Sequence, residues 1–341
     1  MFLKYLSLQN FRNYKKAEFK FSDNTTLIVG PNTSGKSNFI EAISFLSFGK
    51  SFRVENDEQA IQFQANLASV KGKTDSLDLQ VMIAKIPRSL KKYLVNGVSK
   101  RRLDFVGNLP SVSFSPLDLD ILIGSPGKRR EFLDAVLTQT DRDYRLAEAL
   151  YQKGLRQRNR LLHKARETGV RNEKEFEYWD DLLINTGVSI TEKREDFINF
   201  LNTEKKDILD FKIFYDKSVI SIARLLQYKE AELASAVTLV GPHRDDFWVE
   251  LSGHDAKFFA SRGQQRLVVL QLKFLEMLFV KKKLGESPLF LLDDIFSELD
   301  QDHINLVLDM VGSQQTFITT THKELVPKKV IKMSIIELNL Q

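Results

Sequence analysis

The feature that most constrains this chain is a glycine-bounded loop, Gly30-Pro-Asn-Thr-Ser-Gly-Lys-Ser37, between an apolar run and a helical pattern. The spacing G-x-x-x-x-G-K-[ST] is that of a phosphate-binding loop, in which glycines allow successive backbone amides to turn inward towards an anion. The positive end of the following helix adds to this cradle. An ordinary glycine turn before a helix is the alternative, but the strand pattern at 25–29 favours nucleotide binding.

Two side chains of the loop have expected roles. Lys36 supplies a positive charge to the β- and γ-phosphates, and the Ser37 hydroxyl is placed to ligate Mg²⁺. Arg12 and Asn13 lie in the turn before the loop, where they could contact the nucleotide or equally be solvated turn residues. The expected nucleotide contacts are Gly30, Pro31, Asn32, Thr33, Ser34, Gly35, Lys36, Ser37, Asn38, Arg12 and Asn13.

Composition places the chain among soluble globular proteins, with 43% hydrophobic and 28% charged residues in 341. A net charge of +5 and a pI near 9.1 are only mildly basic, so any nucleic-acid surface must be sought in local clusters. The chain has no cysteine, which is consistent with a reducing cytoplasm. No run approaches the ~20 apolar residues of a membrane span, and the expected localisation is cytoplasmic, without a membrane partner.

Hydrophobic periodicity predicts an α/β domain with a helical insertion. Short alternating runs predict strands in residues 1–30 and antiparallel strands in 52–115, with Asn96-Gly97 as a hairpin turn. Helical periodicity dominates from about 118 to 229, and strands return at 237–240, 247–251, 288–294 and 315–321. The predicted domains are a discontinuous α/β domain, 1–116 and 233–341, and an inserted helical, basic subdomain, 117–232.

Two adjacent carboxylates follow the apolar run Leu289–Leu292. In parallel α/β sheets the carboxyl ends of the strands meet at one edge, where ligands bind. Asp293 is therefore expected to hold Mg²⁺ through water beside Ser37, and Asp294 to lie next to a hydrolytic water. A strand-to-turn aspartate pair is common on its own, but the upstream phosphate-binding loop favours the metal interpretation.

A strongly basic segment lies in the helical insertion. Residues 153–166 carry six Lys or Arg and no acidic residue, so this helix face would repel itself unless an anion covers it. A solvated helix face is the alternative. The candidate DNA contacts, including a second cluster before this segment, are Lys128, Arg129, Arg130, Lys153, Arg156, Arg158, Arg160, Lys164 and Arg166.

Ser261-Arg-Gly-Gln-Gln265, at the start of a helix, resembles the signature loop of ABC-type ATPases. The chain order strengthens this resemblance: phosphate-binding loop, signature, Asp293-Asp294, Ser297-Glu-Leu-Asp300, and a strand that ends at His322. The resemblance implies an ABC-type ATPase head in which Ser261, Arg262, Gly263, Gln264 and Gln265 act on the nucleotide of a second subunit. It also implies interface positions at Ser297 and Asp300, and catalytic contacts from Asp294 and His322.

A narrower resemblance is to the RecF family, which is similar to the heads of chromosome-maintenance ATPases. The motifs that carry it are Leu8-Gln-Asn-Phe-Arg-Asn-Tyr14, Gly30–Asn38, Ser115–Leu119, Gly124–Asp134, Leu155–Leu162, Gly241-Pro-His-Arg-Asp-Asp246 and Ser261–Leu267. The resemblance implies an ATP-dependent homodimer that binds gapped DNA at single-strand/double-strand junctions during replication, repair and the response to DNA damage. RecO- and RecR-type mediators and the recombinase RecA would be its partners, and ATP hydrolysis would be slow.

Two other functions stay open from the sequence. One is a nucleotide-binding subunit that energises a membrane transporter, which the long basic insertion disfavours. The other is an ATP-binding scaffold without turnover, suggested by Asp294 where most ABC ATPases carry glutamate. The sequence also does not decide which of Gln59, Gln62, Gln64 and Gln80 senses the metal.

Overall fold

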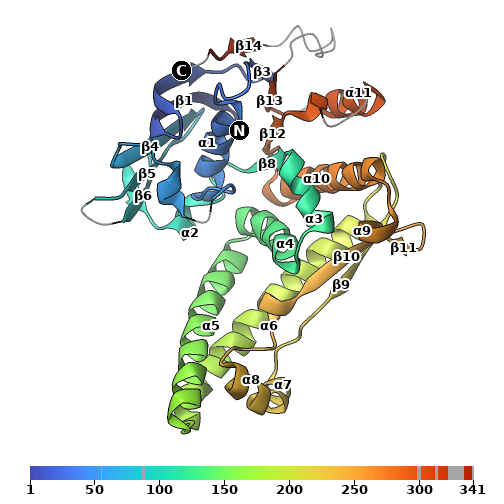
Figure 1. Cartoon of the computed structure of the whole chain (residues 1–341). Helices are drawn as coiled ribbons and strands as arrows, with labels where there is room; N and C mark the ends of the chain where they lie inside the picture. Colours follow the sequence, from blue (N-terminus) through green and yellow to red (C-terminus); the bar gives the residue numbers. More distant parts are fainter. Residues whose placement is uncertain (55, 87–88, 298–300, 312–313, 322–333, 340–341) are drawn as a thin grey trace. The chain divides into compact units, whose positions relative to one another are not determined.

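The computed structural model describes residues 1–339 except 55, 87–88, 298–300, 312–313 and 322–333. The chain divides into two compact units, Met1–Asp118 together with Glu276–Gln341, and Leu119–Leu275. Figure 1 labels their helices and strands. The expected insertion, 117–232, and the second unit begin within a few residues of each other. They end at different places, because the second unit continues to Leu275.

A parallel sheet of five strands forms the centre of the first unit (Figure 1). Its order is β14-β3-β13-β12-β8, and every neighbouring pair is parallel. The strands are β3 (Thr26–Val29), β8 (Ser111–Phe114), β12 (Leu289–Asp293), β13 (Thr316–Thr320) and β14 (Ser334–Glu337). Since parallel strands end at the same edge, the phosphate-binding loop after β3 and the aspartates at the end of β12 share that edge.

An antiparallel sheet of six strands, in the order β2-β1-β4-β5-β6-β7, completes the first unit. The strands are β1 (Leu3–Phe11), β2 (Tyr14–Lys20), β4 (Leu67–Thr74), β5 (Asp78–Ala84), β6 (Leu90–Val95) and β7 (Val98–Lys100). The predicted hairpin is confirmed, because Asn96 and Gly97 join β6 to β7 with φ of 51° and 77°. Both central residues of such a turn need positive φ, which asparagine and glycine tolerate best.

Helix α1 (Lys36–Phe48) packs into the core that the two sheets share. Phe39, Ile43 and Leu46 of this helix are fully buried, in one cluster with leucines of β1 and β12. A helix that is buried almost all round needs apolar side chains on every face, which this one has. The remaining short elements of the unit are η1 (Asp57–Ala60), α2 (Arg102–Phe105), η2 (Pro116–Leu119), η4 (Ile295–Ser297) and α11 (Gln301–Met310).

The second unit is mainly helical, and its two longest helices, α5 and α6, pack against each other. Its helices are α3 (Asp120–Ile123), α4 (Pro126–Thr140), α5 (Arg142–Thr168), α6 (Glu173–Thr203), α7 (Ile222–Gln227), α8 (Lys229–Ser235), η3 (Pro242–Arg244) and α9 (Ala256–Phe259), with the first part of α10 (Arg262–Leu284). In the described part of the chain, no helix combines the length and apolar character that a membrane crossing requires.

A small antiparallel sheet, β11-β10-β9, explains why the second unit extends beyond 232. Strand β9 (Lys212–Asp216) pairs with β10 (Asp246–Leu251), which pairs with β11 (His254–Asp255). The expected strand at 237–240 is wrong: these residues form a loop. Side chains hold its backbone instead, because Asn159 accepts from the Thr238 N–H and Glu232 from the Leu239 N–H.

Candidate nucleotide site and basic surfaces

The backbone of the phosphate-binding loop requires glycine at both ends. Gly35 has a φ of +100°, and a Cβ there would lie 2.7 Å from the Asn13 side chain and 2.9 Å from the Tyr14 hydroxyl. A Cβ on Gly30 would lie 2.7 Å from the Leu338 carbonyl oxygen. The Tyr14 hydroxyl also donates to the Gly35 carbonyl at 3.0 Å. Strand β2 therefore holds the loop where α1 begins.

Lys36 and Ser34 lie buried in this loop. The Lys36 Nζ donates to the carbonyls of Gly30 at 2.7 Å and Pro31 at 2.9 Å. Burial lowers the pKa of the Lys36 ammonium, and the nearby carboxylates of Asp294 and Asp293 act in the opposite direction. The Ser34 hydroxyl is buried and forms no hydrogen bond with any residue that the structure describes. A buried, unpartnered hydroxyl beside a buried ammonium suits an anionic ligand such as a phosphate.

The two expected metal ligands lie together in the first unit. The Ser37 Oγ donates to Asp293 Oδ1 at 3.3 Å. A hydroxyl and a carboxylate are oxygen donors of the kind that Mg²⁺ prefers, and it keeps several waters and phosphate oxygens as its other ligands. Among the residues that the structure describes, no cluster of three acidic or histidine side chains offers an alternative metal site.

Asp294 follows the metal-ligand candidate in a left-handed conformation, with a φ of 53°. Its backbone N–H donates to the Thr319 Oγ1 at 3.0 Å, so β13 fixes the chain where β12 ends. The other residues expected near this edge are less well described. His322 and Asp300 lie outside the described residues, and Ser297 is described only as the last residue of η4.

Arg12 anchors the turn before the loop to α1. Its guanidinium makes two hydrogen bonds, of 2.9 and 2.5 Å, to the carboxylate of the fully buried Glu41. Its Nη1 donates to the Gln59 carbonyl at 3.0 Å. Arg12 therefore forms an ion pair with a buried carboxylate. This role of Glu41 is not among those predicted from the sequence, although an acidic residue inside an apolar helix is a usable signal of a buried ion pair.

Asn13 joins the loop to residues further along the chain. Its Oδ1 accepts from Asn38 Nδ2 at 2.8 Å, and Arg53 donates to Asn38 Oδ1 at 3.0 Å. Arg53 was not predicted from the sequence, where nothing sets it apart from other exposed arginines. Of the four candidate glutamines, Gln62 donates to the Asn13 carbonyl at 3.4 Å, whereas Gln80 bonds Ser69 within the antiparallel sheet.

The signature segment begins α10 in the second unit. The Ser261 hydroxyl accepts from the Gln264 N–H, and the Gln264 side chain accepts from the Ser261 N–H, which is a capping box. Ser261 to Gln264 are exposed, and space beside the Cα of Gly263 is open. Gln265 corrects the prediction, because its buried amide donates to the carbonyls of Ala256 and Lys257. Its side chain holds α9 and is not free to contact a nucleotide.

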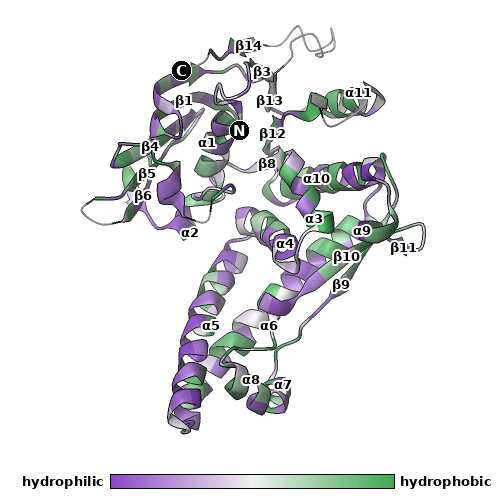
Figure 2. Cartoon of the chain, viewed as in Figure 1, coloured by the Kyte–Doolittle hydropathy of each residue, from purple (hydrophilic) through white to green (hydrophobic). Residues whose placement is uncertain are grey.

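The basic segment on α5 divides into exposed and buried side chains. Lys153, Arg156, Arg160 and Lys164 are exposed and follow each other at three or four residues, so they lie on one helix face. Figure 2 shows α5 as largely hydrophilic. Lys164 is paired with Glu175, while Lys153, Arg156 and Arg160 have no ion pair or side-chain hydrogen bond with the described residues. The candidates that stay exposed on this helix are Lys153, Arg156, Arg160, Lys164 and Arg166.

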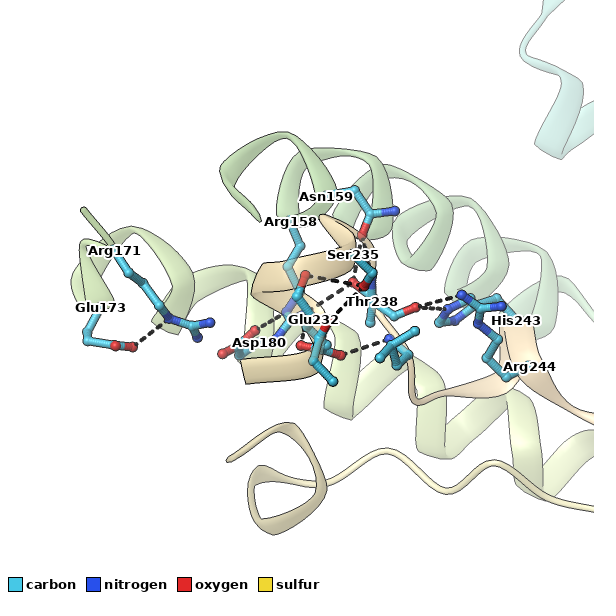
Figure 3. A network of polar contacts seen from close by, with 12 residues as sticks. Arg158, Asn159, Arg171, Glu173, Asp180, Glu232, Ser235, Thr238, His243 and Arg244 are labelled. Carbon is cyan, nitrogen blue, oxygen red and sulfur yellow. Dashed lines mark hydrogen bonds and ion pairs between the residues drawn. The ribbon is translucent and has the colours of Figure 1, made fainter. Parts of the chain in front are cut away.

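Arg158 is wrong as a DNA contact, because it is fully buried. Its Nε donates to Asp180 at 2.6 Å and its Nη1 to the Thr238 hydroxyl at 3.0 Å, and the buried Glu232 lies 2.7 Å away. Figure 3 shows this network. Removing one partner of such a buried pair leaves an uncompensated charge, so Arg158 serves the fold of the second unit.

The cluster before α5 is corrected in a similar way. Arg129 is buried and forms two hydrogen bonds, of 2.5 and 2.9 Å, to the carboxylate of Asp246. Arg130 donates to the Asp245 carbonyl at 2.7 Å. Lys128 is exposed and paired with Glu131 one turn later. In this cluster Arg129 is therefore wrong as a DNA contact, whereas Lys128 is exposed and Arg130 is half-buried.

The segment Gly241–Asp246 ties these helices together. His243 lies between the Thr238 carbonyl, at 2.9 Å from Nε2, and the Tyr151 hydroxyl, at 2.7 Å from Nδ1 (Figure 3 shows His243 beside Thr238). Burial lowers the pKa of His243 to about 4, so the ring is neutral near pH 7. Because a carbonyl only accepts, Nε2 carries the proton and Nδ1 accepts from Tyr151. Arg194 completes the junction through the Pro242 carbonyl and Asp245.

Comparisons with known proteins identify the family. The family described as "RecF/RecN/SMC N terminal domain" matches residues 2–339. The DNA replication and repair protein RecF of Moorella thermoacetica is 37% identical over 97% of this chain and 93% of its own. That of a Geobacillus species is 34% identical over 98% of this chain and 96% of its own. The chain belongs to the RecF family. The alternative of a transporter subunit is therefore set aside.

Solved structures agree with this family. A structure of the recombination mediator protein RecF-ATP in the RecFOR pathway has a TM-score of 0.87 and 32% identity, over 96% of this chain and 93% of that one. The Smc head domain of Pyrococcus furiosus, with an extended coiled coil, has a TM-score of 0.55 at 17% identity over 100% of this chain and 94% of that one. The latter likeness concerns the fold alone. The expected fold is confirmed as an α/β ABC-type ATPase head.

Proposed function

We propose that this chain is an ATP-dependent DNA-binding protein of replication and recombinational repair. In this proposal ATP gates a homodimer that binds single-strand/double-strand junctions at gaps and promotes the loading of a RecA-type recombinase. The names of its relatives, together with the likeness to RecF-ATP of the RecFOR pathway, support DNA repair, ATP and mediator partners of the RecO and RecR type. The observation that carries the proposal is that a glycine-bounded loop buries both the Lys36 ammonium and the Ser34 hydroxyl.

The roles of individual residues follow from the first unit. The loop amides and Lys36 would bind the β- and γ-phosphates. Ser37 and Asp293 would hold Mg²⁺, which supplies charge neutralisation to the phosphates when bound. Asp294 would orient and deprotonate the attacking water. Hydrolysis in this proposal is slow and ends the DNA-bound state, so turnover acts as a switch.

The proposal is tested by measuring oligomeric state and DNA binding together. Light scattering should show dimers with ATP and Mg²⁺ and monomers without nucleotide. Gapped duplex should bind more tightly with ATP than without it, and more tightly than blunt duplex of equal length. Equal affinity for the two DNAs in every nucleotide state would refute the junction preference.

The exposed basic face of α5 gives a prediction about DNA. Changing Lys153, Arg156 and Arg160 together to glutamate should weaken binding to all sequences similarly. The salt dependence of affinity should also become flatter, by roughly 0.9 in the logarithmic slope for each phosphate that the protein no longer neutralises. Fluorescence anisotropy with gapped duplex at several salt concentrations measures both effects. Arg158 must stay intact, because its loss would leave the buried Glu232 without its positive partner and strongly destabilise the second unit.

A matched control separates local contacts from net charge. Lys16, Lys20 and Lys92 lie on strands β2 and β6 of the antiparallel sheet and are exposed. Changing all three to glutamate alters the net charge by the same amount. The control variant should keep most of the DNA affinity. If the α5 variant binds as the parent does at each salt concentration, that face is only solvated.

The exposed start of α10 gives a prediction about the dimer. Ser261→Arg places a long charged side chain at the helix N-terminus, where a second subunit's nucleotide would dock. The variant should bind ATP as the parent does but no longer dimerise with ATP. Because Ser261 caps the helix, Ser261→Ala is the control for the loss of the cap, which costs about 1 kcal/mol. A Ser261→Arg protein that still dimerises in light scattering would contradict the composite site.

A further inference from the structure

Thr319 lies between the two aspartates that the proposed mechanism uses, although it belongs to neither sequence motif. It sits on β13, which pairs in parallel with β12, and its register partner on β12 is Asp293. The side chain is fully buried. Its Oγ1 donates to Asp293 Oδ1 at 2.6 Å and accepts from the Asp294 N–H at 3.0 Å. One hydroxyl therefore contacts both residues.

The direction of these hydrogen bonds is fixed. A backbone N–H can only donate, so the Thr319 oxygen accepts from Asp294. A hydroxyl has one proton, and the carboxylate of Asp293 is the acceptor at 2.6 Å. A hydrogen bond to a charged acceptor is shorter and stronger than one between neutral groups. The hydroxyl proton thus orients the Asp293 carboxylate.

The two carboxylate oxygens of Asp293 therefore have different surroundings. Oδ1 accepts from Thr319 and, at 3.3 Å, from Ser37. Oδ2 receives no hydrogen bond from any residue that the structure describes. A carboxylate held through one oxygen presents the other in a fixed direction. This is how groups behind a metal ligand orient it, and their loss commonly weakens metal binding or activity by roughly 10–100-fold.

The consequence for Asp294 concerns its backbone. A positive φ is uncommon outside glycine and persists where the surroundings hold it. Here the N–H of Asp294, with a φ of 53°, is held by the Thr319 hydroxyl. The chain therefore turns sharply after Asp293, and the direction in which the Asp294 side chain leaves β12 depends on the same hydroxyl.

We infer that Thr319 is a positioning residue, which orients Asp293 towards Mg²⁺ and fixes the turn that presents Asp294. This inference rests on the proposed function, since it deepens the metal and water roles of the same site. This positioning role belongs to a threonine of β13, outside both the phosphate-binding loop and the aspartate pair. Valine, which has nearly the same shape but no hydroxyl, is the substitution that isolates it.

The test compares Thr319→Val with two other variants. Thr319→Ser keeps the hydroxyl and should restore the parental behaviour. Thr316→Val is the matched control, because Thr316 lies on the same strand, is fully buried, and among the described residues donates to the Gln314 carbonyl, at 3.3 Å, and not to an aspartate. Thermal unfolding of all three variants identifies any general loss of stability. Thr319→Ala provides the same hydroxyl deletion if valine disturbs packing.

The primary measurement is the binding of a fluorescent ATP analogue at increasing Mg²⁺ concentrations. Its readout is the Mg²⁺ concentration at which Mg²⁺ has half of its full effect on binding. This readout does not depend on hydrolysis. For Thr319→Val this concentration should rise roughly 10–100-fold, while nucleotide binding without Mg²⁺ stays parental. The Mg²⁺ requirement of single-turnover hydrolysis should rise in parallel. Thr319→Ser and Thr316→Val should resemble the parent in both measurements.

Several outcomes would overturn the inference. A parental Mg²⁺ requirement in Thr319→Val would mean that the hydroxyl does not orient the metal ligand. An equal defect in Thr319→Ser or Thr316→Val would show that strand packing, and not the hydroxyl, is responsible. Failure of the proposed function has a different signature, because the parent itself would then bind no ATP or show no response to Mg²⁺.

Discussion

Lys36→Ala should lower the affinity for ATP by on the order of 2–5 kcal/mol, which is roughly 30- to 5,000-fold in the dissociation constant. The ammonium is buried, and Asp293 and Asp294 are near enough to affect its pKa. In the proposed site, removing it leaves the phosphates without their compact positive charge. Isothermal titration calorimetry with ATP measures the loss directly.

A second lysine near the same helix is the control. Lys50 is exposed and follows the last turn of α1. Lys50→Ala removes the same charge from the chain without touching the loop, and should bind ATP as the parent does. Because Lys36 also bonds the Gly30 and Pro31 carbonyls, thermal unfolding must show that Lys36→Ala is folded. Near-parental ATP binding by a folded Lys36→Ala protein would refute the phosphate-binding assignment.

The arrangement of the candidate nucleotide site could be predicted from sequence because its parts are local or ordered along parallel strands. Gly35 and Lys36 lie in one short loop, and the positive φ that the loop needs at position 35 is readily adopted by glycine. Asp293 follows an apolar strand, and the parallel arrangement brings the end of that strand to the loop. Such predictions depend on the chain order of strands, which the sequence displays.

The buried charges could not be predicted, because their partners come from distant segments. Arg158 looks like its exposed neighbours Arg156 and Arg160 in a basic run. Its burial depends on Glu232, from α8, and on Thr238, whose loop was expected to be a strand. The run Val237–Val240, with two valines and a threonine, favours a strand by propensity, but here side chains of other segments satisfy its backbone.

Thr319 illustrates a third limit. Its strand was predicted, yet three threonines follow one another at Thr319–Thr321, and periodicity alone does not say which faces Asp293. The register of β12 against β13 decides it, by placing Thr319 opposite Asp293. Register between strands that are far apart in the chain is set by packing, which a single sequence does not show.

Asp294→Asn is the second large effect that we expect. Orienting and deprotonating the attacking water is the task of a general base, which contributes typically ~10²–10⁴-fold to a rate. The amide of asparagine has nearly the same size but cannot take the proton. The variant should therefore bind ATP and dimerise as the parent does, while single-turnover hydrolysis slows by roughly 10²–10⁴-fold. Dimers on gapped DNA should live correspondingly longer.

The neighbouring aspartate provides the comparison that gives this prediction its force. Asp293 accepts from Ser37 and Thr319 and is the expected metal ligand, so Asp293→Asn should damage Mg²⁺-dependent ATP binding as well as turnover. The two variants have the same charge change at adjacent positions, yet only one should affect binding. Single-turnover hydrolysis and dimer lifetime, measured side by side, separate them. Hydrolysis at the parental rate in Asp294→Asn would place the base elsewhere. If the parent itself does not hydrolyse ATP even with gapped DNA, the chain is an ATP-binding scaffold without turnover. The structural reason would be that the carboxylate of aspartate, shorter than that of glutamate, does not reach the water. The ATP-bound state would then end by dissociation of the nucleotide.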